Sequence, residues 1–176
     1  VTAILVGDAL NTEAFNLIAN ASLHNDIKVE LIKCLAHNGG INGMIIGQAI
    51  DCHFEKQKIQ LNQLEFLHIH KTARLIAASL KMGAIISEYD LQTQEKLYNF
   101  GIDLGLLFQI QDDIIDETCT EEEAGKTTQN DGFKNSFVNL LGLDGAKKSA
   151  DDLALKCIDS LNTFEEKKKK SLEELL

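Results

Sequence analysis

The most informative stretch of the sequence runs from Phe108 to Asp116 and reads F-Q-I-Q-D-D-I-I-D. Apolar residues in and before it recur at spacings of three and four, which is typical of an α-helix. With about 100° between successive residues, Asp112 and Asp116 lie one turn apart on one face of that helix. Asp113 flanks them, and Gln109 lies one turn earlier. The stretch therefore predicts a helix that ends in three crowded carboxylates.

Carboxylates at the C-terminal end of a helix destabilise it in two ways. They repel one another, and each meets the negative end of the helix dipole at a cost of about 0.3–1 kcal/mol. A divalent cation removes both penalties, and magnesium commonly binds one or two carboxylates together with substrate phosphates and water. The cluster is either such a metal site or a solvated acidic helix end. The neighbouring Phe108-Gln109 and Gly125-Lys126 favour the metal site.

Glycines precede the acidic cluster on the same helical face. Phe108, Gly105 and Gly101 follow one another at helical spacing, whereas Leu104 and Leu107 point elsewhere. We expect this face to leave room for a hydrocarbon chain with a diphosphate head.

Three lysines could supply positive charge to an anionic ligand. Lys71 shares a helical face with leucines, so it either extends to the surface or points into a cavity with an anionic partner. Thr72 follows it, and its hydroxyl can bond to a carbonyl of its own helix and bend it. Lys126 and Lys134 come soon after the carboxylates. Loop lysines are usually solvated, but they can also contact a diphosphate across a metal–carboxylate site.

A further polar pair lies upstream. Gln48 and Asp51 are three residues apart and face alike on a helix. They are either an ordinary polar helix face or support for the residues that bind the ligand.

The rest of the chain follows a helical pattern. No segment sustains the two-residue alternation of a half-buried strand, and the 176 residues contain no proline, which breaks helix interiors. We expect helices over Thr2 to Asn20, over Asp26 to about Phe54 with an interruption near Gly39-Gly40 and Gly43, over Asn62 to about Gly83 with an Asn62-x-x-Glu65 capping box, and from after Asp90 to about Asp116. A polar loop over 117–131 and two or three helices complete a single all-α helix bundle over residues 1–176.

Charge and hydropathy exclude two classes of partner. The formal net charge is −10, whereas nucleic-acid binding requires a basic face. No run of eighteen apolar residues is present, so we expect no stable membrane insertion.

Five short motifs together resemble the farnesyl and geranyl diphosphate synthase family, the trans-type short-chain polyprenyl diphosphate synthases. They occur in the order of that family and extend over essentially the whole chain. The motifs are G-D-A-L (7–10), G-Q-A-I-D (47–51), H-K-T (70–72), F-Q-x-x-D-D-x-x-D (108–116) and G-K (125–126). The resemblance implies an isoprenoid-synthase-type fold, of which this chain is the C-terminal part.

The resemblance assigns roles to the charged residues. Asp112, Asp113 and Asp116 correspond to the second aspartate-rich motif of the family, with Asp112 as the direct Mg²⁺ ligand. Lys71 and Lys126 would contact the allylic diphosphate.

It also assigns roles to uncharged residues. Thr72 and Gln109 would place oxygens near the developing allylic cation, and Phe108 belongs to the same substrate-binding set. Lys134 matches a later lysine of the family less securely, because Phe133 stands where a glycine usually precedes it.

The resemblance predicts a magnesium-dependent prenyltransferase. It would condense dimethylallyl or geranyl diphosphate with isopentenyl diphosphate to give geranyl or farnesyl diphosphate, as a cytoplasmic homodimer. The first aspartate-rich motif and the isopentenyl diphosphate site are not in this sequence, and we expect the intact protein to carry them before Val1. A non-catalytic or regulatory subunit of a heteromeric prenyl synthase and a related prenyl-diphosphate cyclase are the alternatives.

Overall fold

The fold is a bundle of helices, seen here in a computed structural model that describes residues 1–55, 57–119 and 135–176. Its helices are α1 (Thr2–Asn20), α2 (Asn25–Gly39), α3 (Met44–His53), α4 (Leu61–His68), the π-helix η1 (Ile69–Ala73), α5 (Arg74–Ile86), α6 (Leu91–Thr118), α8 (Phe137–Leu161) and α9 (Glu166–Glu173). The described residues form no strand, which confirms the predicted all-α class. Among them, no helix combines the length and apolarity that crossing a membrane requires.

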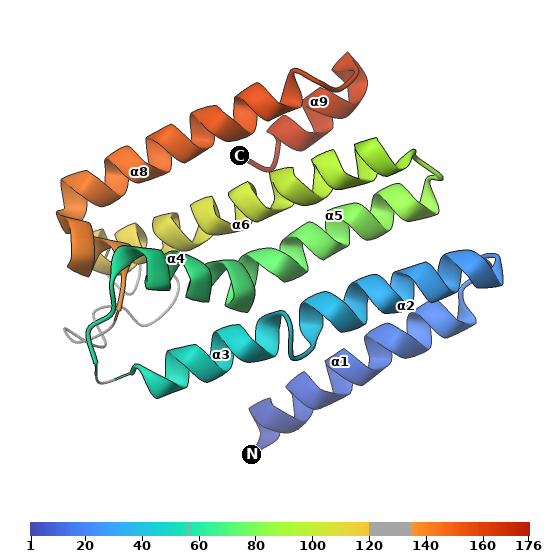
Figure 1. The fold of residues 1–176 in the computed structure, drawn as a ribbon, viewed down its shortest axis with the longest axis horizontal. Helices are drawn as coiled ribbons and strands as arrows, with labels where there is room; N and C mark the ends of the chain where they lie inside the picture. The colour runs from blue at the N-terminus through green and yellow to red at the C-terminus, as the bar shows by residue number, and fades with distance from the viewer. Residues whose placement is uncertain (56, 120–134) are drawn as a thin grey trace.

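The helices run back and forth beside one another (Figure 1). The α1 helix lies along α2, α5 lies next to α6, and α6 lies between α5 and α8 (Figure 1). The C-terminal end of α6 and the N-terminal end of α4 therefore meet at the same end of the bundle as α3 (Figure 1). The fold thus brings together three of the motif-bearing segments, because η1, which carries H-K-T, contacts both α3 with G-Q-A-I-D and α6 with the acidic motif.

Most predicted boundaries agree with the structure, but two do not. The α1 helix has the expected bounds, and Asp90 caps α6 by accepting the N–H of Thr93 at 2.8 Å. The predicted Asn62 capping box is wrong, because α4 begins one residue earlier and the Gln63 side chain instead accepts the N–H of Gln60 at 2.9 Å. The helix expected to close near Gly83 continues to Ile86 and contains the π-helix.

The central core joins α4, α6 and α8. Its buried side chains are Ile59, Leu64, Leu67, Leu107, Ile110, Phe137, Ala146 and Ala150. The α6 helix supplies apolar residues to this core, while Asp112 and Asp116 on the same helix remain partly exposed. Packing of the apolar face therefore determines where the acidic end of α6 points.

The glycine face of α6 is filled by protein, so our expectation that it leaves room for a hydrocarbon chain is wrong. A methyl group at Gly101 would come within 2.5 Å of the Ala77 Cα, and one at Gly105 would come within 2.7 Å of the Ala73 Cβ. Both glycines are buried where α6 crosses α5 and η1. They allow close approach of the backbones and so hold the π-helix against α6.

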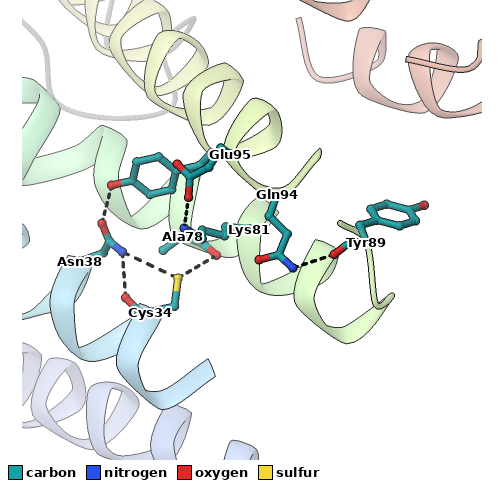
Figure 2. Close-up of polar contacts among 8 residues, drawn as sticks. Cys34, Asn38, Ala78, Lys81, Tyr89, Gln94 and Glu95 are labelled. Atoms are coloured by element: carbon teal, nitrogen blue, oxygen red, sulfur yellow. Dashed lines mark hydrogen bonds and ion pairs between the residues drawn. The ribbon is translucent and has the colours of Figure 1, made fainter. Parts of the chain in front are cut away.

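A polar cluster fastens the break between α2 and α3 to α5 and α6 (Figure 2). Asn38 is only 3% exposed; its amide donates to the Cys34 carbonyl at 2.8 Å, and its oxygen accepts from the Tyr98 hydroxyl at 2.6 Å. Lys81 pairs with Glu95 beside it. Burial raises the pKa of both the Cys34 thiol and the Tyr98 hydroxyl, so both remain protonated at neutral pH.

Candidate active site

The π-helix η1 carries two of the predicted site residues, Lys71 and Thr72. Short π-helical turns occur frequently at functional sites because they shift the side chains that follow. The turn is supported from the preceding residues, since the His70 ring stacks on Phe66 at 3.9 Å and its Nδ1 lies 2.8 Å from the Phe66 carbonyl oxygen. Burial lowers the pKa of His70, which favours the neutral ring.

Lys71 has an anionic partner that our set of predicted site residues did not include. Its ammonium donates to Asp51 on α3 at 2.5 Å. The two side chains are 35% and 39% exposed, so the pair opens to solvent. Gly47, on the same helix as Asp51, lies directly against the Lys71 backbone. The G-Q-A-I-D segment therefore supports the lysine, as one reading of the Gln48 and Asp51 spacing suggested.

Thr72 and Gln109 meet across the interface between η1 and α6. The Thr72 hydroxyl donates to the Gln109 side-chain oxygen at 3.3 Å. The hydroxyl thus bonds across to α6 rather than to a carbonyl of its own helix, and the local distortion of the helix is the π-helical turn. The contact brings the segment that carries Lys71 beside the helix that carries Asp112.

The three carboxylates of the acidic motif occupy different environments. Asp112 and Asp116 are partly exposed, as a ligand site requires. Asp113 is only 2% exposed, and its Oδ2 accepts the backbone N–H of Phe137 at 2.9 Å. The motif therefore presents two oxygen-bearing side chains outward and one inward.

The donor set fits magnesium bound together with a ligand. Within the part of the chain that the structure describes, no three histidine, cysteine, aspartate or glutamate side chains gather closely enough to hold a metal ion by themselves. Magnesium usually takes only one or two carboxylates and completes its shell with phosphates and water. Asp112 and Asp116 can supply those carboxylates, whereas a closed metal cage would need more protein ligands.

The remaining predicted residues are less directly placed. Phe108 is 55% exposed and borders a cavity of about 140 Å³ between α6 and the last two leucines. Lys126 and Lys134 lie outside the described residues. A larger cleft of about 630 Å³ is lined by Arg74, Lys33 and members of the polar cluster in Figure 2 rather than by the predicted site residues. We therefore take η1 and the C-terminal part of α6 as the candidate site, since the Thr72–Gln109 hydrogen bond joins these two segments.

Comparison with known families identifies the class of protein. The sequence profile of the polyprenyl synthetase family matches residues 1–175, so the chain belongs to that family. The family resemblance predicted from the five motifs is thereby confirmed.

Individual relatives agree with this assignment. The chain is 42% identical over 166 residues to a farnesyl diphosphate synthase of Micrococcus luteus, covering 93% of this chain and 57% of the relative. It is 38% identical over 165 residues to a farnesyl diphosphate synthase of Haemophilus influenzae, covering 91% and 56%. The chain thus spans a little over half the length of these relatives.

A solved structure confirms the fold. The crystal structure of a geranyltransferase from Helicobacter pylori, complexed with magnesium and isoprenyl diphosphate, superposes with a TM-score of 0.89 and 52% sequence identity. The match covers 99% of this chain and 57% of that protein. The helix bundle is therefore of the isoprenoid-synthase type.

Proposed function

We propose that this chain is part of a magnesium-dependent prenyltransferase that condenses an allylic diphosphate with isopentenyl diphosphate. The allylic substrate would be dimethylallyl or geranyl diphosphate, and the product geranyl or farnesyl diphosphate. The Thr72–Gln109 contact carries the proposal, because it joins the π-helix bearing Lys71 to the helix bearing Asp112 and Asp116. The geranyltransferase and farnesyl diphosphate synthase relatives support the same class of reaction.

Asp112 and Asp116 would hold Mg²⁺ against the diphosphate. The bound ion would neutralise charge on the diphosphate leaving group. Without it, two carboxylates and a diphosphate would repel one another at the negative end of the α6 dipole. These two side chains therefore bind the substrate only through the metal.

Lys71 would bind the diphosphate directly. Its ammonium is already held at Asp51, so the side chain samples fewer orientations than a free lysine and loses less conformational entropy when it binds the diphosphate. Because the pair is partly exposed, Asp51 binds the ammonium weakly enough for it to be shared with an arriving diphosphate oxygen. Lys126 and Lys134 would add positive charge from the following segment.

The reacting carbon chain of the substrate would be contacted by Thr72, Gln109 and Phe108. When the allylic C–O bond breaks, its electron pair leaves with the diphosphate and a cation remains on carbon. The oxygens of Thr72 and Gln109 would face that cation with their lone pairs, and Phe108 would contact the apolar substrate. The double bond of isopentenyl diphosphate then forms the new C–C bond, and loss of a proton restores neutrality.

The other parts of the proposal concern the whole protein. Since the chain spans a little over half of its relatives, we assign none of its residues to isopentenyl diphosphate. A homodimer and a cytoplasmic location are proposed on the family resemblance alone.

The test is turnover of geranyl and isopentenyl diphosphates by the complete protein, followed by product chromatography with and without Mg²⁺. Because a metal supplies several kcal/mol of charge stabilisation, Asp112→Ala should lower turnover by about a hundredfold or more. Asp144→Ala, an exposed aspartate on α8, is the matched control and should retain wild-type turnover. An Asp112 variant within a few-fold of wild type would contradict the proposal.

The same assay separates the alternatives. A non-catalytic subunit would bind the diphosphate and form no product. A cyclase would consume the allylic diphosphate without isopentenyl diphosphate. Product that requires both substrates would support the synthase.

A further inference from the structure

Asp113 stands apart from the other two carboxylates of the acidic motif. We propose that it is a positioning residue that fixes the acidic end of α6 against the start of α8, and that it is not a magnesium ligand. The inference rests on the proposed function for the roles of Asp112 and Asp116. That Asp113 fixes α6 to α8 can be tested independently of the proposed function.

Burial is the first observation. A carboxylate that is only 2% exposed loses its hydration and must be compensated by hydrogen bonds or positive charge. The Oδ2 of Asp113 receives such a bond from the N–H of Phe137, the first residue of α8, at 2.9 Å. That N–H is one of the first backbone donors of α8, for which the helix itself has no acceptor, so the carboxylate oxygen satisfies it. Asp113 therefore has a structural reason to be acidic that involves no metal.

The start of α8 is anchored on a second side as well. Asn135 donates to the Phe54 carbonyl at 3.0 Å and to the Gln57 carbonyl at 2.8 Å, and it accepts the N–H of Ile59 at 3.2 Å. Ser136 then caps α8 by accepting the N–H of Asn139 at 3.1 Å. The segment that enters α8 is thus fixed to the connection between α3 and α4, and Asp113 fixes α6 to the same point.

The hydrogen bond of Asp113 also affects the orientation of the two neighbouring aspartates. A bond from Asp113 to α8 prevents the last turns of α6 from rotating about the helix axis. Asp112 and Asp116 lie one turn apart on a neighbouring face, so the same bond sets the direction in which both point. The acidic motif then contains two ligands and one residue that orients them.

The experiment compares three variants of the complete protein, Asp112→Asn, Asp113→Asn and Asp113→Ala. Asparagine at 113 keeps an oxygen that can accept the Phe137 N–H, whereas alanine removes it. One measurement is calorimetric titration of Mg²⁺ in the presence of inorganic diphosphate. The other is the thermal unfolding midpoint in the absence of metal, which reports the anchor independently of activity.

Metal binding should separate the two aspartates. Asp112→Asn removes the negative charge of a direct ligand and should weaken Mg²⁺ binding by more than about tenfold. Asp113→Asn removes only a nearby charge and should change it by about threefold or less. Equal weakening by both asparagine variants would overturn the proposal.

Unfolding should separate the two Asp113 variants. Asp113→Ala leaves a buried N–H without its acceptor and should lower the midpoint by about 3–10 °C, while Asp113→Asn keeps an acceptor oxygen and should lower it by less. An unchanged midpoint for Asp113→Ala would overturn the proposal. If wild type and Asp112→Asn bound Mg²⁺ and diphosphate equally, the proposed function would fail, and the midpoints would still decide the role of Asp113.

Discussion

Replacement of Gly47 by alanine tests how closely α3 supports the lysine of the site. Gly47 is buried, and a methyl group there would lie 2.6 Å from the Lys71 Cα and 2.8 Å from the His70 carbonyl carbon. These are backbone atoms of η1, so the overlap can be relieved only by moving a helix. Such overpacking costs about 1–3 kcal/mol. In a chain of this size, that corresponds to a midpoint lowered by about 2–12 °C.

Gly83→Ala is the matched control. Gly83 also lies within a helix, α5, but nothing approaches within 4 Å of the methyl group that alanine would add. Alanine exceeds glycine in helix propensity, so this variant should be more stable than wild type by about 0.4–1 kcal/mol. Thermal unfolding of both variants, followed by circular dichroism, gives the comparison.

The same pair of variants tests function. Gly47→Ala should also raise the KM for the allylic diphosphate, because displacement of η1 moves Lys71 away from its position beside Asp51. Gly83→Ala should leave KM unchanged. If the two alanine variants shifted the unfolding midpoint in the same direction and by the same amount, the packing argument would be refuted.

Two other perturbations have defined outcomes. Asp51→Asn keeps an acceptor but removes the charge that competes for Lys71. The free energy of unfolding should therefore change by less than about 1 kcal/mol, and the KM for the allylic diphosphate should fall by up to about fivefold. A higher KM would contradict this role of Asp51. Burial raises the pKa of Cys157 from 9.0 to about 11, so its stabilising contribution is present below pH 9.0 and is lost as the pH rises through about 11. Urea unfolding from about pH 8 to 11 should therefore show a smaller loss of stability in Cys157→Ala than in wild type, and equal losses would exclude the contribution.

Much of the fold could be predicted from local signals in the sequence. The periodicity of α1, the glycines that interrupt α2 and α3, and the Asp90 cap all act within a few residues of the helix they define. The predicted Asn62 cap failed because Gln60 and Gln63 form a competing pair two residues away. A sequence cannot decide between neighbouring caps of similar strength, since tertiary packing selects where the helix begins.

The features of the site that the sequence could not show involve contacts between distant segments. A glycine face looks identical in sequence whether a ligand or another helix fills it, and Ala73 and Ala77 decided that question for Gly105 and Gly101. Similarly, spacing alone placed Asp113 beside Asp112, but the partner that turns it inward is a backbone N–H twenty-four residues further along.

The residues of the π-helix show the opposite case. Lys71 and Thr72 were predicted because an H-K-T motif accompanied the other four, and the structure brings Thr72 to Gln109 as a shared site requires. The role of Asp51 stayed open between an ordinary polar helix face and support for the ligand-binding residues. No local rule predicts that it pairs with Lys71, which lies twenty positions further along the chain.

The most direct measurement is an equilibrium titration of geranyl diphosphate into the complete protein, with Mg²⁺ present and then removed by chelation, for wild type and for Asp112→Asn. We expect tight binding only for wild type with Mg²⁺, because the acidic end of α6 repels a diphosphate unless a cation lies between them. Equal affinity in all four combinations would show that the diphosphate binds elsewhere, and the assignment of this site would then be wrong.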